Sequence, residues 1–369
     1  MDLKKIGFFN RESEKEDLMN ILGTEPHLIN FIYGPINSGK TSLIVNLIEN
    51  LPSDYVVFYI NLRGKFISDY EDFLRALFRV EKNKELKDIL KELAIKLAIK
   101  TEKTIHRTSG LPVNESLLES LFKNKTKEDV FEFLEDYFKE IGKTKIPVLI
   151  IDELQVIGDL KIDDYLIYKL FNFFIRLTKE LHLCHVFALS SDSLFIERVY
   201  SEAMLQGRCQ YLLVDDFDYK TTERFLKQYR FNKDEIEIAW NCAGGKPGYL
   251  INLVSAKETK KNVKENAKEM IENRKHALLF TFAENKDKKD EILKIFRNFE
   301  RINEIEFDEY INLEILKFLI KKNILFMDAV KKSIKPQSKQ ELVVIREILK
   351  EPEKQEKIPE LNNINNKNA

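Results

Sequence analysis

Short apolar runs alternate with longer amphipathic segments over the first two thirds of the chain. Five runs of six to eight residues are almost wholly apolar and rich in β-branched and aromatic side chains, a pattern typical of strands buried on both faces of a sheet. They lie at residues 28–34, 55–60, 147–152, 183–190 and 209–214. Most segments between them have apolar positions at helical spacing. Strands that alternate with helices predict an α/β fold with a parallel sheet.

Residues from about 82 to 145 interrupt this alternation. They are rich in Lys, Glu, Leu and Phe at helical spacing, and the turn sequence TSGLPVN at 108–114 divides them. We expect a helical insertion after the second strand, with its charged residues in solvent.

The strand signals stop near residue 218, and three short helical patterns follow. AGGKPG separates the last two, because glycine favours the end of a helix and Pro247 suits the first turn of the next. Further on, helical patterns surround a strand signal, ILFMDA, which fits a winged helix. The last segment is polar and aperiodic, so we expect disorder. The predicted parts are a core at 1–217, a helical lid at 218–262, a winged-helix-like domain at 263–350 and a disordered tail at 351–369.

Composition narrows the class of protein. The 369 residues are 44 % apolar, enough for packed cores in more than one domain. The net charge is only -1, so any nucleic-acid surface would be local. The three cysteines are far apart and form no CxxC pair, so we expect no disulfide framework. The HLCH run at 182–185 lacks the spacing of a zinc site, so we expect no metal at that run. With no apolar signal segment and no run near ~18 apolar residues, we expect a soluble, cytoplasmic protein.

The loop after the first strand carries the strongest chemical signal. Residues 34–41 match G-x-x-x-x-G-K-[ST] in full, between an apolar strand and an amphipathic helix. Glycines let successive backbone N–H groups turn toward phosphate oxygens, and the helix N-terminus adds positive potential. Lys40 supplies a cation for the β- and γ-phosphates, and Thr41 a hydroxyl for Mg²⁺. The predicted nucleotide-binding residues are Gly34, Pro35, Ile36, Asn37, Ser38, Gly39, Lys40, Thr41 and Ser42.

A carboxylate is needed on the other side of the metal. Asp152 and Glu153 follow four apolar residues of the third strand, at the carboxyl end, where open α/β sheets bind ligands. We expect Asp152 to hold Mg²⁺ together with Thr41. Glu153 would polarise the water that attacks the γ-phosphate. The alternative for Glu153 is a solvated helix cap.

Polar residues near the fourth and fifth strands are further candidates. Ser190 or Ser191 could hydrogen-bond the attacking water or the γ-phosphate, and the alternative is a serine that starts a loop. Arg198 and Arg208 are candidates for the cation that stabilises the transition state. Arg208 directly precedes the fifth strand, so it could act on its own site or on that of a neighbouring subunit. The alternative for both arginines is a structural salt bridge.

These motifs, with NRE at 10–12 and GKP at 245–247, resemble the archaeal ATPase family, which belongs to the STAND branch of P-loop ATPases and is related to AAA+ and origin-recognition ATPases. The resemblance covers about residues 6 to 256 and loosely extends to about 350. It implies a P-loop NTPase with a five-stranded parallel sheet in the order 5-1-4-3-2, a helical lid and a winged-helix domain. It also implies Asn10 and Arg11 near the adenine pocket, Pro247 approaching the base from the lid, and Arg208 as the family's Gly-Arg element.

We therefore expect an ATP hydrolase that requires Mg²⁺ and whose nucleotide state moves the lid and the winged helix. One alternative is a regulatory switch that binds ATP and hydrolyses it slowly. Another is a DNA-associated ATPase, because Lys331, Lys332 and Lys335 fall where a wing would lie and can contact phosphates. A protein partner or a homo-oligomer is compatible with each hypothesis, and no membrane partner is expected.

Overall fold

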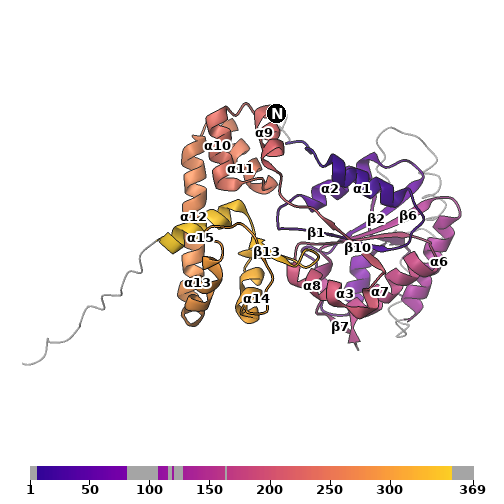
Figure 1. The fold of residues 1–369 in the computed structure, drawn as a ribbon. Helices are drawn as coiled ribbons and strands as arrows, with labels where there is room; N and C mark the ends of the chain where they lie inside the picture. Colours follow the sequence, from indigo (N-terminus) through magenta and orange to yellow (C-terminus); the bar gives the residue numbers. More distant parts are fainter. Residues whose placement is uncertain (1–5, 81–106, 115–118, 120–127, 163, 351–369) are drawn as a thin grey trace, which may run out of the picture.

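A parallel sheet forms the centre of the larger domain in the computed structural model, which describes residues 6–80, 107–114, 119, 128–162 and 164–350 (Figure 1). The sheet has the order β10-β1-β9-β6-β2-β4, and every adjacent pair is parallel. Its strands are β1 (Ile29–Tyr33), β2 (Tyr55–Asn61), β4 (Arg107–Ser109), β6 (Ile146–Asp152), β9 (His185–Ser190) and β10 (Cys209–Leu213). The five predicted strands take the expected order 5-1-4-3-2, and β4 adds a sixth beside β2.

The insertion after β2 is not purely helical. In its described part, β4 joins the central sheet, and β5 (Leu111–Val113) pairs in parallel with β3 (Phe78–Val80) before helix α6 (Glu128–Gly142). The prediction of helix and turn is therefore wrong at these strands. Each has only three residues, too few for a periodic pattern to identify. The helical pattern at 84–100 and the predicted disordered tail lie outside the described residues.

Helices cover both faces of the sheet because successive strand residues point to opposite sides. Ile32 packs against α1 (Glu12–Leu22) and α2 (Lys40–Asn50), whereas its neighbour Phe31 packs against the helices of the other face. These are α3 (Tyr70–Leu77), α6, α7 (Leu166–Ile175) and α8 (Ser193–Ser201), with the small hairpin β7 (Lys161–Ile162) and β8 (Asp164–Tyr165) preceding α7. The sheet therefore presents its polar groups at its ends, where the strands meet loops.

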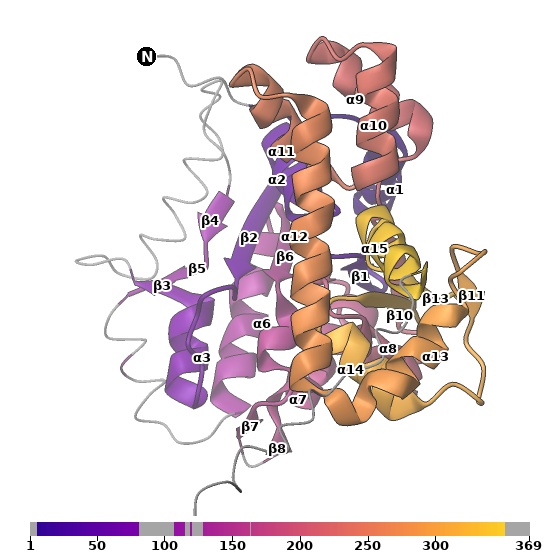
Figure 2. The same ribbon diagram turned by 90° about the vertical axis from the view of Figure 1, so that its left-hand side faces the viewer.

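Three helices, which we call the lid after the predicted domain, follow β10, and one long helix joins them to the C-terminal domain. The lid consists of α9 (Tyr219–Gln228), α10 (Lys233–Ala243) and α11 (Pro247–Glu258). Helix α12 (Val263–Glu284) buries Val263 and Ala267 in the lid's core and Leu278 and Phe282 in the core of the C-terminal domain. Its 22 residues give a length of about 33 Å at the rise of an α-helix. Figure 2 shows this helix running from the lid to the C-terminal domain. Helix α12 is therefore part of the cores of both the lid and the C-terminal domain.

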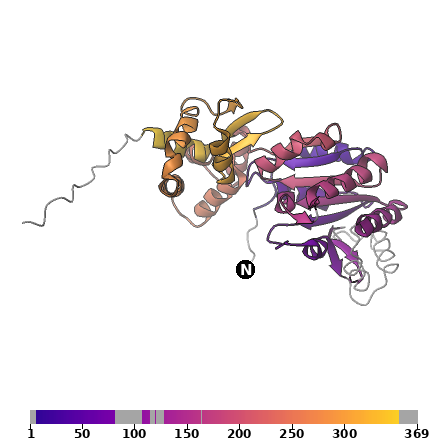
Figure 3. The same cartoon turned by 90° about the horizontal axis from the view of Figure 1, so that it is seen from below.

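The C-terminal domain combines helices with a three-stranded antiparallel sheet. Its further elements are α13 (Lys289–Arg297), β11 (Ile305–Glu306), α14 (Leu313–Lys321), β12 (Leu325–Asp328), β13 (Ser333–Pro336) and α15 (Lys339–Lys350). A winged helix combines such elements, and that assignment stays a prediction. The β12–β13 hairpin reaches the larger domain (Figure 3), where Phe326 and Ala329 enter the core beside α8. Within the described residues, every helix is too short or too polar to cross a membrane.

Candidate nucleotide-binding site

The loop between β1 and α2 curls over the carboxyl end of the sheet. Gly34, Asn37 and Gly39 have φ angles of 151°, 60° and 98°, a region in which glycine is favoured. Gly34 also leaves no room for a side chain, since a Cβ there would lie 2.2 Å from the carbonyl oxygen of Val214. Because α2 begins directly after Gly39, its free N–H groups lie at the same place.

Two polar groups of the loop suit an anionic ligand. Lys40 is buried, and its ammonium donates hydrogen bonds to the carbonyls of Gly34 (3.0 Å) and Pro35 (2.8 Å). Burial, and next the charge of Lys246, lower the pKa of Lys40 to about 8. The buried hydroxyl of Ser38 has no hydrogen-bond partner among the described residues. A phosphate group would offer an acceptor to Ser38 and a compensating charge to Lys40, so the loop fits a nucleotide.

Asp152 and Thr41 lie side by side as predicted from the two motifs. The Thr41 hydroxyl donates to Asp152 Oδ2 at 2.8 Å. The hydroxyl of Tyr59, on β2, donates to the same oxygen at 2.7 Å. Carboxylate and hydroxyl oxygens are the ligands that Mg²⁺ prefers, so this pair fits that ion. Tyr59 was missed because it lies in an apolar strand, although a buried tyrosine hydroxyl usually has a polar partner.

Glu153 follows β6 with a left-handed backbone, at φ 62°, and is buried. Its carboxylate forms an ion pair with Arg63 and accepts a hydrogen bond from Gln155 Nε2 at 2.6 Å. Gln155 Oε1 in turn accepts from the Ser190 hydroxyl at 2.8 Å. Glu153 precedes the short helix Leu154–Ile157 but does not cap it with its side chain. The structure thus joins Glu153 and Ser190 through Gln155, which sequence reasoning missed together with Arg63.

The two arginine candidates lie outside this cluster. Arg208 lies at the amino end of the strands, where its carbonyl accepts a hydrogen bond from Ile29 N at 3.0 Å. Its guanidinium donates to the Met204 carbonyl at 2.7 Å. Because the phosphate loop follows the other end of β1, Arg208 does not reach the site of its own chain, and a role on a neighbouring subunit stays a prediction. Arg198 forms a salt bridge with Asp159 at 2.7 Å, which was the structural alternative.

A cavity of about 350 Å³ adjoins the phosphate loop. Its walls are largely aromatic and aliphatic, and Arg11 and Pro247 are among the residues that line it. The apolar lining includes Phe8, Phe9, Val45, Phe217, Phe225, Pro247 and Ile251. A wall of this kind suits a flat purine ring, and the polar loop at one end suits its phosphates. Asn10 stands between two lining residues, Phe9 and Arg11, but is not itself among the residues that line the cavity. Its side-chain oxygen accepts a hydrogen bond from Arg224 at 3.0 Å.

Arg11 has a contact that the resemblance did not imply. One nitrogen, Nη2, donates both to the Ser38 carbonyl (2.7 Å) and to the Asp215 carbonyl (2.6 Å). The other, Nη1, pairs with Glu14 at 2.5 Å, and the guanidinium lies 4.7 Å from the centre of the Phe217 ring. Arg11 therefore fixes the phosphate loop to the segment that follows β10.

The lid touches the phosphate loop at the N-terminus of α11. A Cβ at Gly248 would lie 3.1 Å from Asn37 Cβ, and one at Gly39 would lie 4.0 Å from Pro247 Cγ. The lid thus closes one side of the cavity with backbone and proline ring in contact with the loop.

The HLCH run does not form a cluster of its own. His182 lies near Glu25 and His27, and one possible ligand atom from each lies within 4.8 Å of the others. His185 instead begins β9, where it is buried and its Nε2 has no partner among the described residues. These residues lie at the amino end of the strands, away from the phosphate loop.

The proteins that this chain resembles in sequence are ATPase-domain and ATP-binding proteins, in agreement with a nucleotide site at the phosphate loop. Residues 8–253 match the model of a family described as an ATPase domain predominantly from Archaea, and residues 264–349 match the C-terminal domain of MJ1010-like uncharacterized ATP-binding proteins. An ATP-binding protein of Methanocaldococcus jannaschii is 50 % identical, over 93 % of this chain and 98 % of its own. One from Pyrococcus abyssi is 45 % identical, with the same coverage of 93 % and 98 %.

Solved structures share the fold. A Walker-type ATPase of Pyrococcus abyssi has a TM-score of 0.62 at 18 % identity, covering 92 % of this chain and 96 % of that one. The ADP form of the ORC2 protein of Aeropyrum pernix has a TM-score of 0.50 at 12 % identity, covering 94 % and 96 %. At such identities the likeness concerns the fold alone. The family match, the relatives and the loop geometry together show that this chain belongs to the archaeal ATPase family and binds ATP.

Proposed function

We propose that this chain hydrolyses ATP with the help of Mg²⁺ at the carboxyl end of β6. The observation that carries the proposal is the hydrogen bond of 2.8 Å between Thr41 and Asp152, with the buried carboxylate of Glu153 adjacent. Thr41 and Asp152 would hold the metal ion, which supplies positive charge to the phosphates when bound. Lys40 would bind phosphate oxygens. Glu153 would orient a water molecule and accept its proton.

We further propose that nucleotide state moves the lid and the C-terminal domain. This is supported by the contact of Gly248 with the phosphate loop and by α12, which is continuous from the lid into the C-terminal domain. A change at the loop would be transmitted through α11 to α12, and ligand binding would shift the balance between two positions of that unit.

A second candidate function is a switch that binds ATP and hydrolyses it slowly. The ion pair between Arg63 and Glu153 favours it. With one carboxylate oxygen held by Arg63 and the other by Gln155, Glu153 has less room to bind and orient an attacking water. Hydrolysis would then become faster when Arg63 moves away, for example on contact with a partner.

Single-turnover hydrolysis and calorimetry test both candidates. Lys40→Met should weaken ATP binding about tenfold or more, and unchanged affinity would refute the site. Glu153→Gln should bind ATP normally and hydrolyse it at least about 100-fold more slowly, and equal rates would remove Glu153 from catalysis. Arg63→Met separates the candidates, because it should accelerate a slow switch and leave a fast hydrolase unchanged or slower. Lys65→Met, an exposed lysine of the same loop, is the matched control.

A DNA partner stays a prediction and has less support than expected from the sequence. Lys331 and Lys332 are exposed, but Lys335 is paired with Asp215 of the larger domain. The three lysines therefore do not form one free surface in this conformation. A gel shift at low salt, repeated after neutralising Lys331 and Lys332, would test the prediction, and the absence of any shift would count against it.

A further inference from the structure

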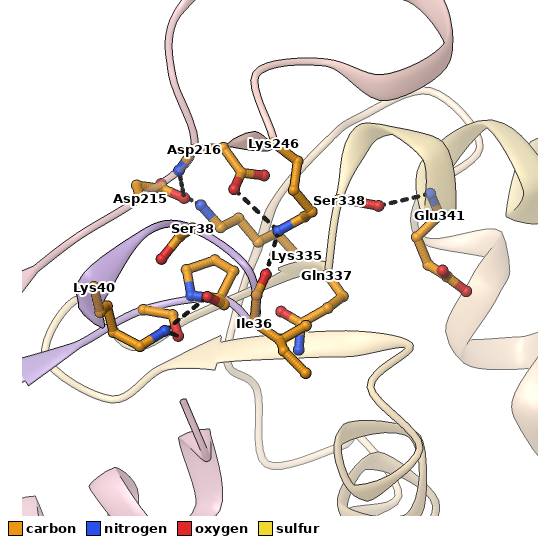
Figure 4. A network of polar contacts seen from close by, with 12 residues as sticks. Ile36, Ser38, Lys40, Asp215, Asp216, Lys246, Lys335, Gln337, Ser338 and Glu341 are labelled. Atoms are coloured by element: carbon orange, nitrogen blue, oxygen red, sulfur yellow. Dashed lines mark hydrogen bonds and ion pairs between the residues drawn. The ribbon is translucent and has the colours of Figure 1, made fainter. Parts of the chain in front are cut away.

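Cations from separate parts of the chain meet two neighbouring carboxylates beside the phosphate loop (Figure 4). Asp215 and Asp216 lie in the linker between β10 and α9, and we call them the linker carboxylates. Lys246 of the lid donates to Asp216 Oδ1 at 3.0 Å and to the Ile36 carbonyl of the phosphate loop at 2.9 Å. Lys335 of the β12–β13 hairpin forms an ion pair with Asp215. Loop, lid and C-terminal domain thus meet at one pair of acids.

Lys246 brings its charge close to that of the phosphate-binding lysine. Its side chain is fully buried, at 0 % exposure, and Asp216 is its ion-pair partner. Burial lowers the pKa of Lys246, and the charge of Asp216 opposes this. Lys40 and Lys246 together donate to three successive carbonyls of the loop, at positions 34, 35 and 36. An anion on this loop is therefore held in the field of both lysines and of the acids behind them.

The linker carboxylates are close enough to the loop to affect a bound anion. Arg11 bridges the carbonyls of Asp215 and Ser38 with a single nitrogen, so linker and loop are adjacent. The pKa of Lys40 is shifted mainly by burial and next by the charge of Lys246, and the charge of Asp216 is among the smaller influences. An acid without a cationic partner at this position would repel phosphates, because opposition between like charges is strong where water is largely excluded.

The hairpin supplies the partner of Asp215 only while it is docked. Docking also rests on the buried Phe326, on the bond from the Tyr33 hydroxyl to Asp328 Oδ1 (2.8 Å), and on a longer bond from Met327 N to Ser193 Oγ (3.4 Å). None of these other contacts involves a charge on the linker. The pair between Lys335 and Asp215 is the contact through which docking brings a cation to the linker carboxylates.

We infer that the linker carboxylates couple the nucleotide site to the C-terminal domain, such that nucleotide binds more tightly when the hairpin is docked and Lys335 neutralises Asp215. The inference rests on the proposed nucleotide site at the phosphate loop. Coupling free energy is reciprocal, so nucleotide must stabilise the docked hairpin to the same extent. Lys246 is a positioning residue in this scheme, because it ties the loop to Asp216 through the Ile36 carbonyl.

Calorimetric titration with ADP tests the electrostatic part without any hydrolysis. Lys335→Met should raise the Kd by about fivefold or more, whereas Lys331→Met, an exposed lysine of the same hairpin, should leave it within about twofold. Asp215→Asn in the Lys335→Met background should restore the affinity, because it removes the charge that Lys335 neutralised. An unchanged Kd for Lys335→Met, or a failure of Asp215→Asn to restore it, would overturn the inference.

Hydrogen exchange of the hairpin tests the reciprocal effect. Saturating ADP should slow exchange of the amides of β12 and β13 in the wild type, and should do so less in Lys335→Met and in Lys246→Met. If the wild type binds ADP and hairpin exchange does not change, the coupling is refuted while the nucleotide site stands. If the wild type does not bind ADP, the proposed function itself fails. The ion pair between Lys335 and Asp215 is partly exposed, so we expect Lys335→Met to fold. This variant therefore tests the coupling even if Lys246→Met does not fold.

Discussion

Replacing Arg11 by lysine should weaken both the fold and the nucleotide site. The guanidinium donates through Nη2 to the carbonyls of Ser38 and Asp215, pairs through Nη1 with Glu14 and packs on Phe217. Lysine keeps the charge, but a single ammonium at the end of a flexible stem does not reproduce this planar arrangement. At least one of the two carbonyls should therefore lose its donor.

The size of the effect follows from these contacts. A hydrogen bond from a charged donor contributes about 1.5–3 kcal/mol, and a buried carbonyl without its donor costs a similar amount. We expect Arg11→Lys to lower the free energy of unfolding by about 2 kcal/mol. Because the two carbonyls join the loop residue Ser38 to the linker residue Asp215, loss of either bond loosens the phosphate loop, and we expect a Kd for ADP about tenfold higher.

Urea unfolding and calorimetric titration with ADP would measure both quantities. Arg224→Lys is the matched control, because Arg224 is exposed and donates to Asn10 in the same N-terminal segment. It should change the free energy of unfolding by less than about 0.5 kcal/mol. If Arg11→Lys unfolds and binds ADP like the wild type, Arg11 does not hold the loop to the linker and the reasoning is refuted.

Other features allow tests of fold and packing. Tyr33→Phe should lower the free energy of unfolding by about 1.5–3 kcal/mol, because Asp328 loses a buried hydrogen-bond donor across the domain interface. Unchanged urea unfolding would show that this hydrogen bond does not stabilise the fold. Burial lowers the pKa of His185 from 6.5 to about 4, so the folded state favours the neutral imidazole. Its contribution to the free energy of unfolding is therefore complete above pH 6.5 and is lost as the pH falls toward 4. His185→Leu should therefore gain about 3 kcal/mol relative to wild type between pH 7 and pH 4, and a constant difference in urea unfolding would contradict this. Gly245→Ala would place a Cβ 1.7 Å from a linker carbonyl oxygen and should destabilise by about 2 kcal/mol or more, unlike Gly142→Ala, which meets nothing within 4 Å; equal thermal melting of the two variants would argue against the tight lid contact.

Contiguous patterns predicted most of the architecture. Each long strand is a run of apolar residues, and the loop at 34–42 and the acids at 152–153 are single stretches whose chemistry depends on neighbours in sequence. The pairing of Thr41 with Asp152 could be predicted because Asp152 ends one strand and Thr41 begins the helix after another, so both lie at the carboxyl edge of a parallel sheet. The strands at 107–113 could not, because each has three residues and gains its stability from strands that the sequence does not place beside it.

From the sequence alone we could predict the five long strands, their order by resemblance, and the residues proposed to hold phosphate and metal, because these features depend on local spacing. The identity of the distant side chains that meet at the loop became clear from the three-dimensional packing. Arg11 reaches Asp215 across 204 residues, Lys246 reaches Ile36 across 210, and Lys335 reaches Asp215 across 120. An isolated arginine or lysine in a chain that is one third charged has no periodic signature, and its partner is selected only when packing buries it beside a particular carboxylate or carbonyl.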